Sequence, residues 1–284
     1  MEKNEAMRIK PVAGALGAEI LDVDIAAGLS NSETAAIRDA FLENKVVFFR
    51  EQRLTPKSQT EFARIFGEPD IYPFIKGLPD TPEITEILKT EADAKNFGGS
   101  WHSDTSYMPE PAMGTLLYAL ETPEFGGDTL FANAAAAYEA LSDGLKRALN
   151  GLKAINSSDH GYKGGRAAGM ARLDAMKGTF NPAAQSYESE HPVVRTHPET
   201  GLKSLFLNRS HTVRFKGMTE DESRGLINWL CDHIIRPEFT CRFRWQPGSI
   251  AVWDNRVTQH HAVNDYQGQR RRMHRITLKG DRPH

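Results

Sequence analysis

The stretch GGSWHSDTSYMPEPAMGT (98–115) contains residues whose types and spacing could bind a metal. His102 and Asp104 stand two positions apart in it, between a glycine pair and a run of turn residues. Side chains at positions i and i+2 of an extended strand point to the same side, so both could reach one ion while Ser103 faces away. A hydrogen-bonded pair beside a turn would give the same pattern. A third ligand is needed to decide between the two interpretations.

The stretch WDNRVTQHHAVNDY offers that third ligand as His260 or His261. Consecutive side chains of a strand face opposite ways, so only one of the two histidines should reach the metal, and the local pattern does not choose between them. Two imidazoles and one carboxylate on one side of an ion leave three positions free. This arrangement suits non-haem Fe(II) oxygen chemistry.

The C-terminal stretch QGQRRRMHRITLKG could bind a 2-oxo acid, the source of electrons for many such oxygenases. Arginine suits this role because its planar fork meets a carboxylate with two parallel hydrogen bonds. In an extended strand Arg271 and Arg275 share one face with Met273, and two inward arginines would be costly without anions to pair with. Arg270 and Arg272 point the other way and fit a solvated basic edge.

The overall composition favours a small-molecule substrate. The chain of 284 residues has 35 basic and 37 acidic side chains, so its net charge suggests neither nucleic acid nor a membrane as a partner. The two cysteines, Cys231 and Cys241, lack CxxC spacing and are expected to be reduced core thiols. The N-terminus has no basic region followed by an apolar run. We therefore expect a soluble, cytoplasmic protein.

Short β-type segments outnumber helical ones. Most are bounded by Gly, Pro, Asn or Asp, and several alternate apolar and polar residues, which is typical of a sheet with one buried face. No βαβ rhythm is visible, so the pattern predicts a mainly β sandwich or jelly roll with packing helices. The predicted strands are 45–49, 83–88, 115–120, 193–197, 203–208, 240–245, 249–254 and 273–278.

Three helices are predicted, over 32–45, 55–67 and 219–235. Thr55 and Pro56 form a start signal for the second, and Thr219 with Glu222 forms a capping box for the third. We expect one domain over residues 1–284, because no linker or repeat is visible. The weakly patterned segment near 156–191 is rich in Gly and Ala and is expected to be a lid or binding loop.

Four motifs in order resemble the signatures of one enzyme family. WHSD (101–104), GGDT (126–129), WDNRVTQHHAVNDY and QRRRMHR are similar to those of the taurine dioxygenase/TfdA family of Fe(II)- and 2-oxoglutarate-dependent dioxygenases. The resemblance runs over nearly the whole chain. It implies a double-stranded β-helix (jelly roll), Fe(II) as metal, and 2-oxoglutarate and O2 as co-substrates. The reaction would hydroxylate a C–H bond and release succinate and CO2, and similar proteins are homo-oligomers, dimers or tetramers.

The resemblance also implies a role for each matching residue. His102, Asp104 and His260 would be the iron ligands and thus the catalytic residues, because the family's distal ligand follows a glutamine. Thr129 and Arg271 would hold the far carboxylate of 2-oxoglutarate.

Five residues are implied in substrate binding. Arg275 would pair with an anionic head group, helped by the backbone amide of Thr105. Tyr72 stands where taurine-type enzymes have a sulfonate-binding histidine, and Tyr162 and His211 map to two pocket phenylalanines. These departures argue against taurine itself. The expected substrate is a small organic anion of the sulfonate, sulfate ester or aryloxyalkanoate type.

Two other functions fit part of the pattern. A zinc-dependent hydrolase could use the same His/Asp/His set, because Zn(II) accepts these ligands, but it would leave the anion-binding residues unexplained. A non-catalytic jelly-roll binding module is the other possibility. Such a module could lose its metal ligands, but this sequence has lost none of them.

Overall fold

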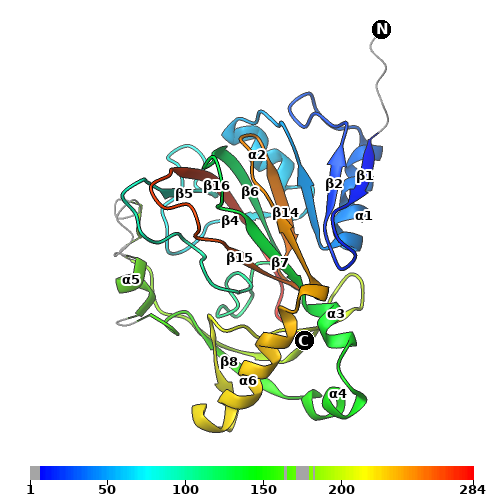
Figure 1. The fold of residues 1–284 in the computed structure, drawn as a ribbon, viewed down its shortest axis with the longest axis vertical. Helices are drawn as coiled ribbons and strands as arrows, with labels where there is room; N and C mark the ends of the chain where they lie inside the picture. The colour runs from blue at the N-terminus through cyan, green and yellow to red at the C-terminus, as the bar shows by residue number, and fades with distance from the viewer. Residues whose placement is uncertain (1–6, 163–164, 171–178, 182) are drawn as a thin grey trace.

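A computed structural model describes residues 7–162, 165–170, 179–181 and 183–284. Its main sheet has the strand order β1-β2-β3-β14-β6-β16-β4, and β5 also pairs with β16 (Figure 1). Neighbouring strands are antiparallel except for β2 and β3. The strands are β1 (Arg8–Pro11), β2 (Ala18–Leu21), β3 (Val46–Phe49), β4 (Pro69–Asp70), β5 (Ile84–Lys89), β6 (Gly114–Glu121), β14 (Ile250–Asp254) and β16 (Arg271–Leu278).

A second sheet, in the order β13-β7-β15, faces the main sheet. Between them lies one apolar cluster in which the rings of Phe48 and Phe243, one from each sheet, stack with centroids 4.1 Å apart. Two packed antiparallel sheets with helices outside confirm the predicted mainly β jelly roll. The second sheet contains β7 (Thr129–Asn133), β13 (Thr240–Phe243) and β15 (Thr258–Ala262).

Smaller sheets and short helices extend one end of this sandwich, below the two large sheets in Figure 1. β12 (Thr212–Phe215), β8 (Lys153–Ser157) and β9 (Glu188–Pro192) form one small sheet, and β10 (Val194–Thr196) pairs with β11 (Lys203–Leu205). The helices here are α3 (Ala134–Glu139), α4 (Asp143–Leu149), α6 (Glu220–Ile234) and η2 (Pro237–Phe239). The sequence pattern predicted only α6 among them, because the others have too few residues for a clear periodicity.

The central strands β3, β6 and β14 of the main sheet are buried on both faces, whereas the alternating pattern indicated one buried face. In β3, Val46 and Phe48 belong to the cluster between the sheets. Val47 and Phe49 belong to a second cluster, which contains the apolar faces of α1 (Asn31–Asn44) and α2 (Pro56–Ala63). A strand covered on both sides reads as a continuous apolar run, as VVFF does.

The predicted start signals of α2 and α6 are confirmed, and α1 begins one residue before the predicted position 32. Thr55 caps α2 with Pro56 at its first position, and Thr219 and Glu222 form the capping box of α6. The predicted end of α2 at Gly67 is four residues too late, since the helix ends at Ala63. Local side-chain to backbone hydrogen bonds determine these starts, which is why they can be read from sequence.

The segment predicted as a loop near 156–191 is partly regular. It contains the end of β8, the short helix α5 (Gly165–Met170) and most of β9, whereas 163–164, 171–178 and 182 lie outside the described residues. Its function as a lid stays a prediction.

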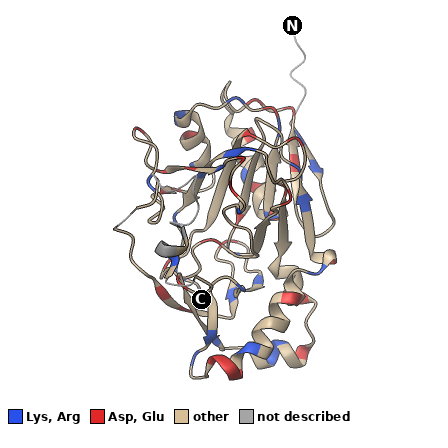
Figure 2. Ribbon diagram, turned by 60° about the vertical axis from the view of Figure 1, so that its left-hand side comes forward, with Lys and Arg blue, Asp and Glu red and all other residues tan. Residues whose placement is uncertain are grey.

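The two cysteines are buried and unpaired, as expected. Burial raises the pKa of Cys231 and of Cys241 to about 12, so both thiols stay protonated at neutral pH. Acidic and basic residues are interspersed along the ribbon in Figure 2. No helix in the described part of the chain is long and apolar enough to cross a bilayer.

Candidate active site

Backbone hydrogen bonds hold His102 against His260. The N–H of His102 donates to the carbonyl of His260 at 3.1 Å, and the N–H of His260 donates back at 2.9 Å. His102 forms only this isolated bridge, and Asp104 already begins a turn, so the extended segment predicted at 102–104 is shorter than a strand. Ser103 nevertheless faces away, because its hydroxyl donates to the carbonyl of Thr258 at 2.7 Å.

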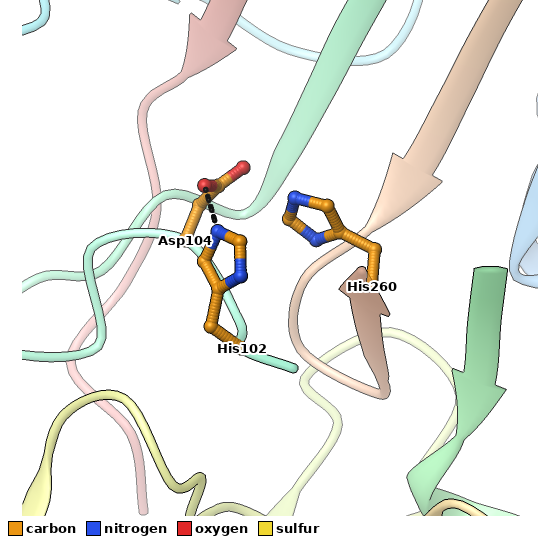
Figure 3. Close-up of side chains that lie close together, drawn as sticks. All are labelled: His102, Asp104 and His260. Atoms are coloured by element: carbon orange, nitrogen blue, oxygen red, sulfur yellow. Dashed lines mark ion pairs between the residues drawn. The ribbon is translucent and has the colours of Figure 1, made fainter. Parts of the chain in front are cut away.

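The side chains of His102, Asp104 and His260 converge (Figure 3). One ligand atom from each lies within 4.8 Å of the others, and Nε2 of His102 is 3.5 Å from Oδ1 of Asp104. Nδ1 of His102 lies 2.7 Å from the carbonyl of Ser100; as N–H donor to it, Nδ1 leaves the lone pair of Nε2 free for a metal. His261 is not part of this cluster, and its ring packs near that of Trp101.

The charge states also fit a divalent metal. Burial would raise the pKa of Asp104, but chiefly the charge of Arg275 outweighs it and holds the pKa well below 3.8. Burial, and next the neighbouring His102, lower the pKa of His260 well below 6.5. An ionised carboxylate and a neutral imidazole are the forms that ligate metals.

Asn255 and Thr115 position Asp104. Oδ1 of Asn255 accepts from the backbone N–H of Asp104 at 3.2 Å and from the indole of Trp253 at 3.0 Å. Its Nδ2 donates to the hydroxyl of Thr115 at 3.1 Å, and that hydroxyl donates to Oδ2 of Asp104 at 2.7 Å. This network fixes both the backbone and the carboxylate of Asp104.

Thr129 and Arg271 line the same inner cavity as the three clustered side chains. The Thr129 hydroxyl accepts from the indole of Trp245 at 2.9 Å, and the guanidinium of Arg271 lies 5.6 Å from that ring. Nε and Nη2 of Arg271 are buried without a hydrogen-bond partner among the described residues. These free donors could hold a carboxylate. Gly127, two residues before Thr129, has φ +70°, and a Cβ there would lie 2.9 Å from the Pro123 side chain, so this turn requires glycine.

Arg275 also lines the inner cavity, 2.8 Å from Oδ1 of Asp104 through its Nη2. Tyr72 lies beneath it, with its ring centroid 4.7 Å from the guanidinium carbon. Thr105 occupies the turn after Asp104 at φ +50°, and its hydroxyl accepts from the backbone of Ala112 at 2.8 Å.

An outer pocket of about 700 Å³ adjoins the inner cavity, and His102 and Asp104 line both. Tyr162 and His211 line this outer pocket, as the resemblance implied for a substrate site. Burial, and next the charge of Arg166, lower the pKa of His211 well below 6.5, so its imidazole is neutral.

Sequence reasoning missed Arg166, Tyr107 and Trp245. Arg166 in α5 lines the outer pocket and is 6% exposed, and Tyr107 is fully buried beside it. An arginine among the small residues GGRAAG of a predicted binding loop was the available signal for Arg166. No pattern marked Tyr107 or Trp245, because aromatic residues near strands are usually core residues.

Comparison with known proteins agrees with this geometry. The family model "Taurine catabolism dioxygenase TauD, TfdA family" matches residues 8–277. An alkylsulfatase of Acinetobacter baylyi is 38% identical over 279 residues, covering 98% of this chain and 86% of the relative. An alpha-ketoglutarate-dependent sulfate ester dioxygenase of Pseudomonas putida is 37% identical over 278 residues, covering 97% and 90%.

Solved structures agree as well. A taurine dioxygenase from Burkholderia xenovorans has a TM-score of 0.81 at 36% identity, covering 98% of this chain and 92% of its own. The enzyme AAD-2, solved with Mn(II) and N-oxalylglycine, has a TM-score of 0.76 at 28% identity, covering 98% of both chains. The chain therefore belongs to the TauD/TfdA family of taurine catabolism dioxygenases and is a 2-oxoglutarate-dependent dioxygenase that uses a metal.

Proposed function

We propose that the protein uses Fe(II) and O2 with 2-oxoglutarate to hydroxylate a C–H bond of a small organic anion. The convergence of His102, Asp104 and His260 carries this proposal, since two imidazoles and one carboxylate on one side of an ion suit Fe(II) oxygen chemistry. When bound, the metal would activate O2 with 2-oxoglutarate as reductant, giving succinate, CO2 and hydroxylated substrate.

The protein's own residues bind, orient and exclude water. His102, Asp104 and His260 would hold the metal, and each is at most 9% exposed. Thr129 and the free donors of Arg271 would hold the far carboxylate of 2-oxoglutarate. No side chain has to act as a general base in this reaction.

The charges around the two cavities favour an anionic substrate. Arg275 lines the inner cavity, and Lys95 and Arg166 line the outer one, where Arg209 is already paired with Asp232. Among the described lining residues Asp104 is the single carboxylate, and it would serve the metal. Arg275 would face the anionic head group, and Thr105, Tyr72, Tyr162 and His211 would contribute to substrate binding.

The substrates we propose are sulfate esters, sulfonates or aryloxyalkanoates. The names of the two relatives above support the first of these. Hydroxylation of the carbon that bears a sulfate oxygen would give a hemiacetal-like product, R–CH(OH)–OSO3⁻. This product breaks at the C–O bond into an aldehyde and hydrogen sulfate.

Succinate formation tests the proposal. The protein should form succinate from 2-oxoglutarate only with Fe(II), O2 and a suitable anion, in a screen of alkyl sulfates, alkanesulfonates and aryloxyalkanoates. A zinc-loaded sample without oxygen is the control. Hydrolysis of a sulfate ester in that sample would favour the zinc hydrolase instead. Cytoplasmic location and assembly as a dimer or tetramer stay predictions.

A further inference from the structure

Arg166 carries a positive charge into the interior from a segment outside the two large sheets. It lies in α5 and is 6% exposed, and its Nη2 donates to the hydroxyl of Tyr72 at 2.7 Å. Its guanidinium carbon lies 4.9 Å from the ring centroid of Phe74 and 5.2 Å from that of Tyr107. The aromatic rings thus surround the charge and separate it from water.

No protein anion neutralises Arg166 among the described residues. Its Nε and Nη1 are buried without a hydrogen-bond partner among these residues, and Nη2 donates to the hydroxyl of Tyr72. The carboxylate of Asp159 accepts instead from the backbone N–H of Arg166 at 2.9 Å and from the hydroxyl of Ser186 at 2.6 Å. A buried guanidinium without a counter-ion is costly, so a ligand anion is the expected partner.

Arg275, in strand β16, also contacts Tyr72. Its guanidinium lies over the ring of Tyr72, and its Nη1 is also buried without a partner among the described residues. Its Nη2 pairs with Asp104, which the proposed metal would share. With metal bound, two guanidinium groups around Tyr72 would therefore lack a full counter-charge.

We propose that Arg166 and Arg275 together form a receptor for a tetrahedral oxyanion, with Tyr72 between them. A sulfate monoester or sulfonate has three terminal oxygens and can accept hydrogen bonds from both arginine forks at once. A carboxylate has only two oxygens, and a single guanidinium group already binds both of them. The receptor selects sulfate esters and sulfonates over carboxylates with the same hydrocarbon tail. This inference deepens the proposed function and rests on it.

Hydrogen bonds at the start of α5 support this role of Arg166. Asp159 ties the backbone of Arg166 to Ser186, across the described parts of the segment near 156–191. Gly165 has φ +85°, and a Cβ there would lie 3.3 Å from the Asp159 carboxylate. Glycine therefore allows the turn that brings the next residue, Arg166, to Tyr72.

Calorimetric binding of hexyl sulfate and heptanoate tests the receptor. Both ligands have the same alkyl tail, and the protein is loaded with Mn(II) and N-oxalylglycine so that no turnover occurs. Wild-type protein should bind hexyl sulfate at least tenfold more tightly than heptanoate. Arg166→Gln should weaken hexyl sulfate about 10- to 100-fold and heptanoate less than threefold, as loss of charge-assisted hydrogen bonds predicts.

Three variants separate the receptor from general effects of charge or folding. Arg209→Gln removes another arginine of the outer pocket, one paired with Asp232 at 2.7 Å, and should change hexyl sulfate binding less than twofold. Arg166→Lys keeps the charge without the fork and should recover part of the loss. Tyr72→Phe removes the hydroxyl that holds Arg166 and should weaken hexyl sulfate about threefold to tenfold.

Equal affinity of the wild type for the two ligands would overturn the inference, as would an Arg166→Gln variant that binds hexyl sulfate normally. Hexyl sulfate is also titrated into the metal-free protein, where the effect of Arg166→Gln should persist. Failure of the proposed function would show separately, as a lack of O2-dependent succinate formation. If the protein prefers hexyl sulfate but forms no succinate, the receptor is supported and the proposed reaction is rejected.

Discussion

Nη2 of Arg275 lies 2.8 Å from Oδ1 of Asp104, so the side chain proposed to bind the substrate anion is paired with a proposed metal ligand. Both groups are buried, at 4% and 5% exposure. A metal ion bound to Asp104 would compete for the charge that now neutralises Arg275. The proposed metal and substrate sites would therefore be coupled through one carboxylate.

Metal binding should strengthen substrate binding. Because a divalent ion draws on the charge of Asp104, Arg275 becomes free to pair with the ligand anion. We expect an alkyl sulfate to bind about tenfold more tightly to Mn(II)-loaded protein than to metal-free protein, measured by calorimetry. In Arg275→Gln this difference should shrink to less than threefold. Equal affinities with and without metal in the wild type would disprove the coupling.

The two inward arginines should have separable effects on steady-state kinetics. Arg271→Gln should raise KM for 2-oxoglutarate about 100-fold, because it removes two charge-assisted hydrogen bonds, and should raise KM for the substrate less than threefold. Arg275→Gln should raise KM for the substrate much more than KM for 2-oxoglutarate. The measurement is succinate formation with each reactant varied in turn. The reverse result would mean that the roles of Arg271 and Arg275 are exchanged.

Asn255→Ala should weaken both the fold and the metal site. It leaves the Trp253 indole and the Asp104 backbone N–H without their acceptor, which costs about 2–4 kcal/mol of unfolding free energy. Loss of the partner that orients a ligand typically lowers metal affinity about 10- to 100-fold. Urea unfolding and Mn(II) titration measure the two effects. Asn44→Ala, which removes an amide on α1, is the control and should leave Mn(II) affinity unchanged.

Acidification should destabilise the protein partly through His191. Burial is the main cause that lowers its pKa to about 4, while the unfolded value is about 6.5. Between these values the unfolded chain binds a proton that the folded protein excludes, so stability falls as pH drops from about 6.5 towards 4. His191→Gln keeps a donor for the Met108 carbonyl and removes the titration.

Urea unfolding at pH 7 and pH 5 measures this contribution. The wild type should lose about 2 kcal/mol more unfolding free energy than His191→Gln over that interval. The pKa values of His211 and His260 are lowered as well and act in the same direction, so each variant is compared with the wild type at the same pH. Equal losses of unfolding free energy in the wild type and in His191→Gln would exclude a contribution from His191.

Sequence patterns predicted those features that depend on neighbouring residues. The caps at Thr55 and Thr219 rest on hydrogen bonds within three residues, and both helices start where expected. Residue types and spacing also indicated His102, Asp104 and one of two adjacent histidines, and the family resemblance selected His260, which is the one that converges with them. Their roles, like the extent of the single domain, stay predictions.

Features that depend on packing between distant segments could not be read from the sequence. The apolar run VVFF is compatible with burial of β3 on both sides, but it does not indicate that α1 and α2 cover the outer face. Arg166 stands in a Gly- and Ala-rich segment without periodicity, and only the folded chain brings it to Tyr72. Features held by interactions between neighbouring residues could thus be predicted, and features held by interactions between distant segments could not.

Two reciprocal main-chain hydrogen bonds fasten the loop of His102 to β15, which contains His260. The spacing of these imidazoles is thus set by the peptide backbone and not by the ion. Removal of the metal should therefore leave the positions of His102 and His260 unchanged. We therefore expect chelation to be reversible, with the stripped protein recovering its metal without refolding.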